Sequence, residues 1–191
     1  MKPPIIGSKG AEEEAILAIA KAMLVAARTA PKATGLDDIL TLILHGAEKD
    51  AIAKEMEEIG LERGGHQHKV FERDAKNVRE SEAIILIGVR GEKSVGLNCG
   101  GCGFTTCRAF GVKKKKLGKD FFGPTCVFKM LDLGIALCSA VKTASLLNVD
   151  NRMMFTVGSA AIRLKLMPGS STIIGIPVSA HGKNIYFDRA K

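Results

Sequence analysis

Four cysteines constrain this chain more than any other feature. Three of them lie within nine residues in the pattern C-x2-C-x4-C, and the fourth follows after eighteen more residues: Cys99, Cys102, Cys107 and Cys126. Gly100, Gly101 and Gly103 lie between or directly after the first two thiols. Glycine adopts backbone conformations that strain other residues, so this loop can fold tightly around a small body.

The spacing predicts a [4Fe-4S] cluster at this loop. Each iron of a cubane cluster has one outward position, which a cysteine thiolate fills. Three ligands so close in sequence can surround one body only if the backbone turns sharply between them. Backbone N–H groups of a glycine-rich loop also approach the anionic sulfides and help to set the reduction potential. The fourth ligand can come from farther along, because a folded loop returns the chain.

Zinc is the first alternative. Zinc ribbons usually present two separate C-x2-C pairs, whereas these thiols are grouped three plus one and Cys126 has no neighbouring thiol or histidine. A disulfide framework is a weaker alternative, because residues 1–6 do not have the pattern of a secretory signal and the chain is not a small secreted domain. For the same reason we expect a cytoplasmic protein.

The function expected from a cluster is electron transfer to or from a partner protein or a second cofactor. A zinc-stabilised binding module and a cluster-based redox sensor stay open as alternatives, and no DNA-binding helix pair is evident to favour the sensor. No Ser–His–Asp set or pair of catalytic carboxylates can be assigned. Whether the protein is an enzyme is therefore not decided by these residues.

The cysteine segment also resembles known iron–sulfur proteins. Residues 99–110, with Cys126 beyond, are similar to the small four-cysteine domain of the B subunit of Rnf-type electron-transport complexes and to the cluster domain of corrinoid iron–sulfur proteins. Taken whole, the chain resembles a prokaryotic family described only as having a ferredoxin-like domain. This resemblance implies that Cys99, Cys102, Cys107 and Cys126 hold a [4Fe-4S] cluster, although Val127 stands where those families usually have Pro.

Length and composition indicate one α+β domain, residues 1–191, with an inserted cluster segment over about residues 90–126. The chain has 191 residues, of which 46% are hydrophobic, enough for a sizeable core. The longest apolar stretch, 131–149, is interrupted by Asp132 and Lys142. A membrane span is therefore not expected.

Positive charge gathers in the cluster segment. The net charge is +8, and part of it comes from Arg108, the run Lys113–Lys116 and Lys119. These residues could steer an acidic redox partner or compensate the charge of the cluster, but the simpler interpretation is a solvated loop. Aromatic residues do not alternate with the basic ones as a stacking platform would require, so nucleic-acid binding is not expected.

Hydrophobic periodicity predicts a mixed central sheet flanked by helices. We expect helices over residues 12–30, 48–63, 70–80, 127–147 and 159–167, and strands over 36–44, 83–89, 153–157, 172–179 and 184–188. Asp37 and Asp38 could instead cap a short helix, and Pro177 suggests that the strand over 172–179 lies at an edge or ends there. His66 and His68 are expected in a solvated loop.

The helix expected over residues 127–147 is rich in small residues, which permit a close approach of another backbone. This pattern suits tight core packing or a helix pair across a homodimer interface. Cys138 lies in this helix about 18 Å from Cys126 if the helix is unbroken. We therefore expect Cys138 to be a buried core thiol rather than a cluster ligand.

Outside the cluster segment, the chain weakly resembles the flavin-dependent nitroreductase family. Residues 26–35, Ala-Ala-Arg-Thr-Ala-Pro-Lys-Ala-Thr-Gly, are similar to that family's Ala-Arg-x-Ala-Pro-Ser-x-x-Asn segment, and Gly175–Pro177 is similar to its Gly-Ile-Pro strand. The resemblance implies a nitroreductase-like fold, a dimer and FMN as a second cofactor. Lys32 and Gly35 replace the family's Ser and Asn. Arg28 is the candidate for a flavin phosphate contact, or else a helix C-terminal Arg that complements the dipole, which we favour.

Overall fold

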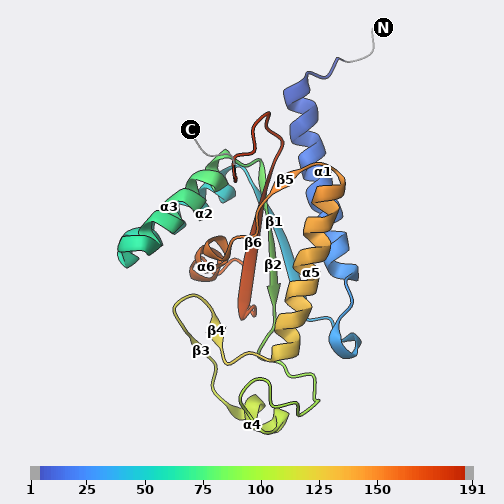
Figure 1. The fold of residues 1–191 in the computed structure, drawn as a ribbon, viewed down its shortest axis with the longest axis vertical. Coiled ribbons are helices and arrows are strands. Elements are labelled where there is room, and N and C mark those ends of the chain that lie inside the picture. Colours follow the sequence, from blue (N-terminus) through green and yellow to red (C-terminus); the bar gives the residue numbers. More distant parts are fainter. Residues whose placement is uncertain (1–4, 188–191) are drawn as a thin grey trace.

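A four-stranded sheet runs through the centre of the computed structural model, which describes residues 5–187 (Figure 1). Its strands, in spatial order, are β1 (Ile39–His45), β2 (Ala83–Val89), β6 (Thr172–Ser179) and β5 (Asp150–Asn151). Every pairing described is antiparallel. The α+β class with a central sheet and flanking helices is confirmed, and the expected mixture of parallel and antiparallel pairing is wrong.

Helices cover both faces of this sheet (Figure 1). On one face lie α1 (Ser8–Thr29) and α5 (Val127–Leu146); on the other lie α2 (Ala47–Arg63), α3 (Gly65–Glu80) and α6 (Phe155–Arg163). A short 3-10 turn, η1 (Ala33–Gly35), connects α1 to β1. Met1–Pro4 and Asp188, the end of the last expected strand, lie outside the described residues.

Strand β2 is the centre of the core, as its continuous apolar run predicts. All seven of its residues are buried. Successive side chains of a strand point to opposite faces. Ile85 and Ile87 therefore pack with α1 and α5, whereas Ile84 and Leu86 pack with α2, α3 and α6.

The small residues of α5 serve core packing. Ala136, Ala140 and Ala144 are fully buried and pack in one cluster with Ala20 and Ala27 of α1. An α-helix has 3.6 residues per turn, so Cys138, two residues from both Ala136 and Ala140, lies on the opposite side of the helix from them. Cys138 is accordingly exposed, and its expected place in the core is wrong.

Two other local expectations are wrong. His66 and His68 lie in α3, not in a loop, because Gly64 and Gly65 both have positive φ and join two helices without an intervening loop. The strand expected over residues 153–157 is replaced by the start of α6. Only Met154 pairs there, in an isolated bridge to Gly175.

The closing hairpin expected around residues 180–183 is also absent from the described part of the chain. Residues 185–187 form a turn, in which the side chain of Asn184 accepts hydrogen bonds from the N–H groups of Tyr186 and Phe187 at 3.0 and 3.2 Å. Strand β6 lies inside the sheet, so the edge position suggested by Pro177 is wrong. Pro177 lies between the Met154–Gly175 bridge and the pairing of β5 with Val178 and Ser179, and the strand continues past it to Ser179.

Residues 90–126 leave the body of the sheet after β2 and return at the start of α5. They contain α4 (Cys107–Val112) and a small hairpin of β3 (Lys116–Leu117) and β4 (Phe122–Gly123). Figure 1 shows them together at the end of the molecule opposite both termini. Among the described residues, no helix is long and apolar enough to cross a membrane.

Helix α6 packs so closely on β6 that Gly158 has no room for a side chain. A Cβ atom there would lie 1.7 Å from the carbonyl oxygen of Ile173. Gly158→Ala should therefore lower the free energy of unfolding by about 3 kcal/mol, because the helix must move away from the strand. Denaturant unfolding followed by circular dichroism measures the change.

The matched control is Gly134→Ala in α5, where an added Cβ would meet nothing within 4 Å. This variant should be more stable than the parent by about 0.5–1 kcal/mol, the usual gain of Ala over Gly in a helix. Equal stabilities of the two variants would contradict the close α6–β6 contact.

Candidate functional site

The two ends of the 90–126 segment are fastened to each other. The backbone N–H of Cys126 donates to the carbonyl oxygen of Gly91 at 2.8 Å. Gly91 in turn donates to Ser171 Oγ at 2.8 Å, and the N–H of Ser171 donates to the carbonyl of Val89 at 2.8 Å. The base of the segment is therefore tied to the ends of both β2 and β6.

Gly91 must be small for this base to close. A Cβ atom at Gly91 would lie 2.4 Å from Ser171 Oγ and 3.0 Å from a methyl group of Thr125. The close approach brings the entry of the segment against its exit. Cys126, the fourth thiol of the motif, is placed at this junction and directly precedes α5.

The loop of the first three thiols is shaped by residues with positive φ. Gly96, Asn98, Gly100 and Gly103 all have left-handed backbone conformations, which glycine and asparagine adopt most readily. Gly103 donates to the carbonyl of Gly100 at 2.9 Å and closes a tight turn around Cys102. The glycines between the thiols thus have the role that the sequence predicts for them.

Cys107 lies at the N-terminus of α4, where Thr106 caps the helix by accepting from the N–H of Ala109 at 3.1 Å. The N–H of Cys107 donates to Asn98 Oδ1 at 2.7 Å, and the N–H of Asn98 lies 3.3 Å from the sulfur of Cys107. This N–H of Asn98, with smaller contributions from Ser94, Gly96 and Leu97, lowers the pKa of the Cys107 thiol. The loop therefore favours a thiolate at this position.

The thiol loop and the start of α5 pack against each other. A Cβ atom at Gly101 would lie 2.8 Å from a methyl group of Val127, the residue after Cys126, and 3.7 Å from the sulfur of Cys99. Gly101 therefore separates the Cys99 side of the loop from the first turn of α5. The structure brings the fourth cysteine to the same end of the molecule as the other three.

All four thiols of the motif are free. Cys99 is exposed, Cys102 and Cys107 are half-buried, and Cys126 is buried. Within residues 5–187, no group of three or more His, Cys, Asp and Glu side chains is arranged to hold a metal ion. Three features fit a cluster: four free thiols as ligands, the N–H donor to the sulfur of Cys107, and the glycine turns of the loop. The described side chains are not grouped around one metal position.

Two aromatic rings support the loop from inside. Phe110 is fully buried and meets Phe104 edge to face at 5.9 Å between ring centroids. The ammonium of Lys115 lies 3.5 Å from the centroid of the Phe110 ring and donates to the Phe110 carbonyl at 2.8 Å. The segment thus has a small core of its own, closed by a cation–π contact.

A buried cation secures the first turn of α5. Lys129 is fully buried, and its ammonium lies 3.1 Å from Asp38 and 3.7 Å from Asp132. It also donates to the Leu36 carbonyl at 2.9 Å, and Asp132 accepts from the N–H of Ala33 at 2.8 Å. This network joins the turn after Cys126 to the connection between α1 and β1.

From the sequence we expect Asp132 only to interrupt an apolar run, and we assign no role to Lys129. A Lys and an Asp three residues apart share one face of a helix, and here that face is otherwise apolar. This spacing was the available signal for a buried pair. Its partner Asp38 could not be identified, because it is ninety-one residues away in the chain.

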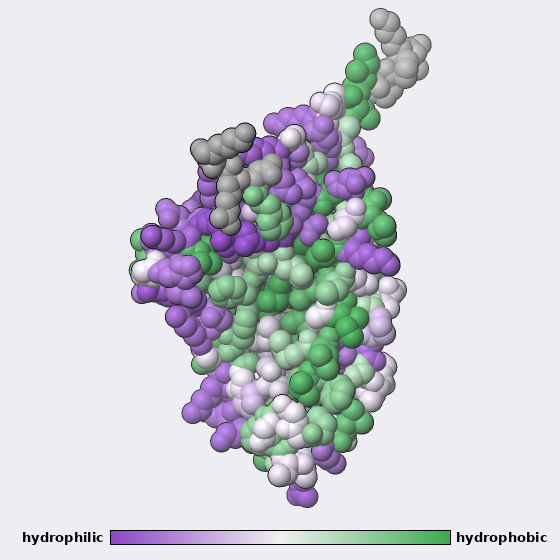
Figure 2. Space-filling view, viewed as in Figure 1, coloured by the Kyte–Doolittle hydropathy of each residue, from purple (hydrophilic) through white to green (hydrophobic). Residues whose placement is uncertain are grey.

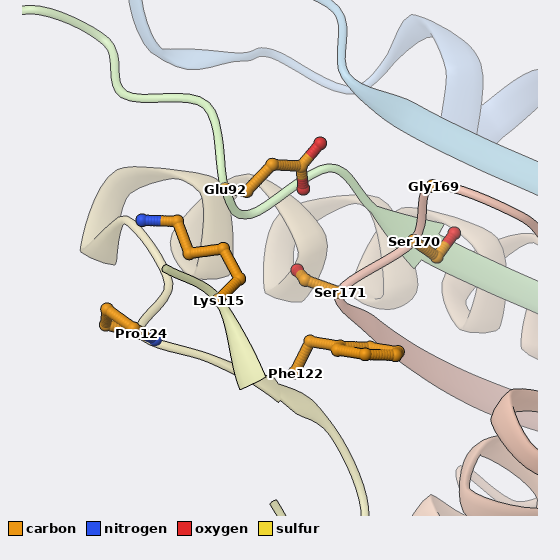
Figure 3. A pocket seen from close by; sticks show the side chains of 7 residues that line it. All are labelled: Glu92, Lys115, Phe122, Pro124, Gly169, Ser170 and Ser171. Atoms are coloured by element: carbon orange, nitrogen blue, oxygen red, sulfur yellow. The ribbon is translucent and has the colours of Figure 1, made fainter. Parts of the chain in front are cut away.

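A cavity of about 210 Å³ lies between the segment and the residues that precede β6 (Figure 3). Its walls include the rings of Phe122 and Pro124 and the stem of Lys115, facing Ser171. The side chain of Glu92 also lines it. The cavity adjoins the base that holds Cys126, and no sequence signal indicates it.

Arg28, the candidate for a flavin phosphate contact, is bonded within the chain at the end of α1. Arg28 donates to Asp37 at 2.6 Å and to the Ile39 carbonyl at 2.8 Å. Desolvation raises the pKa of Asp37, but the hydrogen bonds from Arg28 and Ile39 and the positive charge of Arg28 outweigh it, so this pKa is lowered. Lys32 donates to the carbonyls of Arg28 and Ala30 at the C-terminus of α1. These residues fasten the end of α1, and they do not fit a flavin phosphate site. His66 and His68 form no metal-binding group among the described residues.

The fold is similar to that of solved nitroreductases. A nitroreductase from Lactococcus lactis in complex with nicotinic acid superposes with a TM-score of 0.56 at 14% identity, over 90% of this chain and 80% of that one. A nitroreductase with bound FMN from Desulfitobacterium hafniense gives 0.55 at 15% identity, over 95% and 82%. At these identities the likeness concerns the fold alone.

The chain belongs to the same family as a protein from Archaeoglobus fulgidus. The two are 44% identical over 186 residues, which are 97% of this chain and 98% of the archaeal one, itself described as an uncharacterized protein. The profile of a family described as "Uncharacterized protein containing a ferredoxin domain (DUF2148)" matches residues 122–189. Of the four thiols in the motif, this match includes Cys126.

Lys129→Met tests the buried network. The substitution keeps the length of the side chain but leaves Asp38 and Asp132 without their shared cation, so we expect the free energy of unfolding to fall by about 3–5 kcal/mol. Denaturant unfolding measures it. Lys142→Met, at an exposed position of the same helix, should change stability by less than about 0.5 kcal/mol. A small effect at Lys129 would mean that the network contributes little.

Proposed function

We propose that this protein is a [4Fe-4S] redox protein in which Cys99, Cys102, Cys107 and Cys126 are the cluster ligands. The observation that carries the proposal is the fastening of Cys126 to Gly91, with Gly101 against Val127, because it brings the fourth thiol to the loop of the other three. The family's description as containing a ferredoxin domain agrees with it.

The residues present fit such a cluster in their chemistry. Four free thiols match the four iron positions. The N–H of Asn98 already points at the sulfur of Cys107, and such donors stabilise thiolates and tune cluster potentials. When bound, the cluster would supply one-electron transfer; the chain would hold it, exclude water from Cys126 and orient the thiols. Residues 90–126 would then be the cluster-binding segment of a single domain.

Iron analysis after anaerobic purification tests this function. The parent protein should contain about four irons and four sulfides per chain, and Cys107→Ala or Cys126→Ala should lose most of them. Cys138→Ala is the matched control, because this thiol is also free but lies on the outer face of α5. It should keep the full iron content.

Zinc in place of iron would overturn the proposal. One zinc and no iron per chain after strictly anaerobic growth would indicate a zinc-stabilised binding module. A sensor role would instead keep the iron and show partner binding that changes when the cluster is oxidised. Both readouts use the same purified protein.

FMN is a second cofactor to be tested on the same samples. The support comes from the fold, since a structural neighbour has bound FMN. The chemistry at the end of α1 does not support it, because Arg28 is paired with Asp37. We derive no flavin step from this site. Flavin released on denaturation, at one per chain, would make the protein a candidate flavin-dependent oxidoreductase.

A homodimer through the outer face of α5 forms part of the proposal. Leu131, Ile135 and Cys138 are exposed there and line a surface hollow, and Figure 2 shows apolar side chains gathered along this helix. Apolar patches of this kind usually mark interaction sites. A second copy of the chain would cover the face with the same residues.

Ile135→Glu tests the dimer. A buried charge at the centre of the contact should convert a dimer into a monomer, as measured by size-exclusion chromatography with light scattering. Leu61→Glu, at a more exposed apolar position on α2, should stay dimeric. A monomeric parent protein would contradict the proposed dimer without affecting the cluster.

A further inference from the structure

The residues that surround the thiol loop form a strongly basic surface. Residues 104–125 contain six basic side chains and a single acidic one, Asp120. The exposed basic and aliphatic side chains of this stretch, here called the basic face, are Arg108, Val112, Lys113, Lys114, Lys116, Leu117 and Lys119. In Figure 2, hydrophilic side chains project at the edges of this end of the molecule around paler and apolar ones.

The one acidic side chain of the stretch is neutralised from inside the protein. Asp120 pairs with Arg63 of α2 at 2.6 Å, and Arg63 also donates to the Lys119 carbonyl at 3.1 Å. The Arg63 and Asp120 side chains are only 10% and 20% exposed, and the guanidinium lies 4.7 Å from the centroid of the Phe71 ring. The hairpin is thereby fixed to the body of the protein, and its carboxylate does not offset the charge of the basic face.

The lysine run is divided between the two sides of the segment. Lys115 turns inward to the ring and carbonyl of Phe110. Its neighbours Lys113, Lys114 and Lys116 are exposed and, within residues 5–187, make no ion pair. The contacts of Lys115 fix the backbone of the lysine run to Phe110. The other three lysines of the run therefore start from an anchored backbone and point to solvent together.

Apolar side chains lie among these charges. Val112 is 81% exposed and Leu117 is 51% exposed. Val112 follows Arg108 by one helical turn on the same face of α4, and it directly precedes Lys113. An apolar centre within a charged rim is the usual composition of a protein–protein interface. Phe122 is the exposed aromatic side chain of residues 104–125, at 36%, and a single ring does not make the row of stacking surfaces that single-stranded bases require.

We propose that the basic face docks an acidic protein beside the thiol loop. Charge complementarity selects this partner, because five exposed cations with no internal acid to offset them attract an anionic surface and repel a basic one. The inference rests on the proposed function in one respect: the docked protein would be the electron donor or acceptor of the cluster. The docking itself depends only on side chains of this chain.

Binding of an acidic plant-type [2Fe-2S] ferredoxin, used as the probe, tests the docking by isothermal titration calorimetry at low ionic strength. Lys113→Glu/Lys114→Glu should weaken the affinity by at least about tenfold, and added salt should weaken parent binding in the same direction. Lys21→Glu/Lys183→Glu is the matched control, since it changes the net charge equally at exposed positions on α1 and in the turn after β6. It should bind as the parent does.

Three results would overturn the docking proposal. The first is absence of ferredoxin binding by the parent. The second is equal weakening by both double variants, which would reflect net charge alone. The third is tighter binding of a single-stranded oligonucleotide that is lost in Lys113→Glu/Lys114→Glu, which would make the face a nucleic-acid site. Iron content measured on the same samples reports separately on the cluster, so failure of the two proposals can be distinguished.

Discussion

The hydrogen bond from the N–H of Cys126 to the carbonyl of Gly91 is the contact on which the rest of this end of the molecule depends. It closes the 90–126 segment at its base and sets the point where α5 begins. Ser171 extends the closure to β6, because its hydroxyl bonds both Gly91 and the carbonyl of Val89. A segment that lies outside the sheet thereby acquires a fixed origin at the ends of two core strands.

Three further contacts hold the segment in place, and each uses a charged side chain that is buried or partly buried. Lys129 ties the first turn of α5 to Asp38, Arg63 ties the hairpin to α2, and Lys115 ties the lysine run to Phe110. Buried charges are costly unless they are paired and hydrogen-bonded. These contacts therefore favour one position of the segment, because each cation reaches its partners only in that position.

The nitroreductase-like fold and the thiol motif occupy different parts of this chain. The sheet and its two helical layers follow the nitroreductase fold, as the superpositions show, but the end of α1 is closed by Arg28 and Lys32 bonded within the chain. The thiol motif lies in residues 90–126, outside the regular layers. This separation suits a domain in which the body supplies a rigid base and the segment carries the site.

The sequence by itself determined the elements with a clear local period and the place of the thiols. Strands β2 and β6 have the predicted bounds, α5 begins at the predicted residue, and the glycines between the cysteines form the expected turns. Only the tertiary structure decided that all described strand pairs are antiparallel, that Cys138 faces outward, that α6 begins at Phe155, and that Lys129 is buried. The physical reason is sequence separation: periodicity reports the side of an element that is apolar, whereas partners such as Asp38 and Lys129 meet only after the sheet and helices have packed.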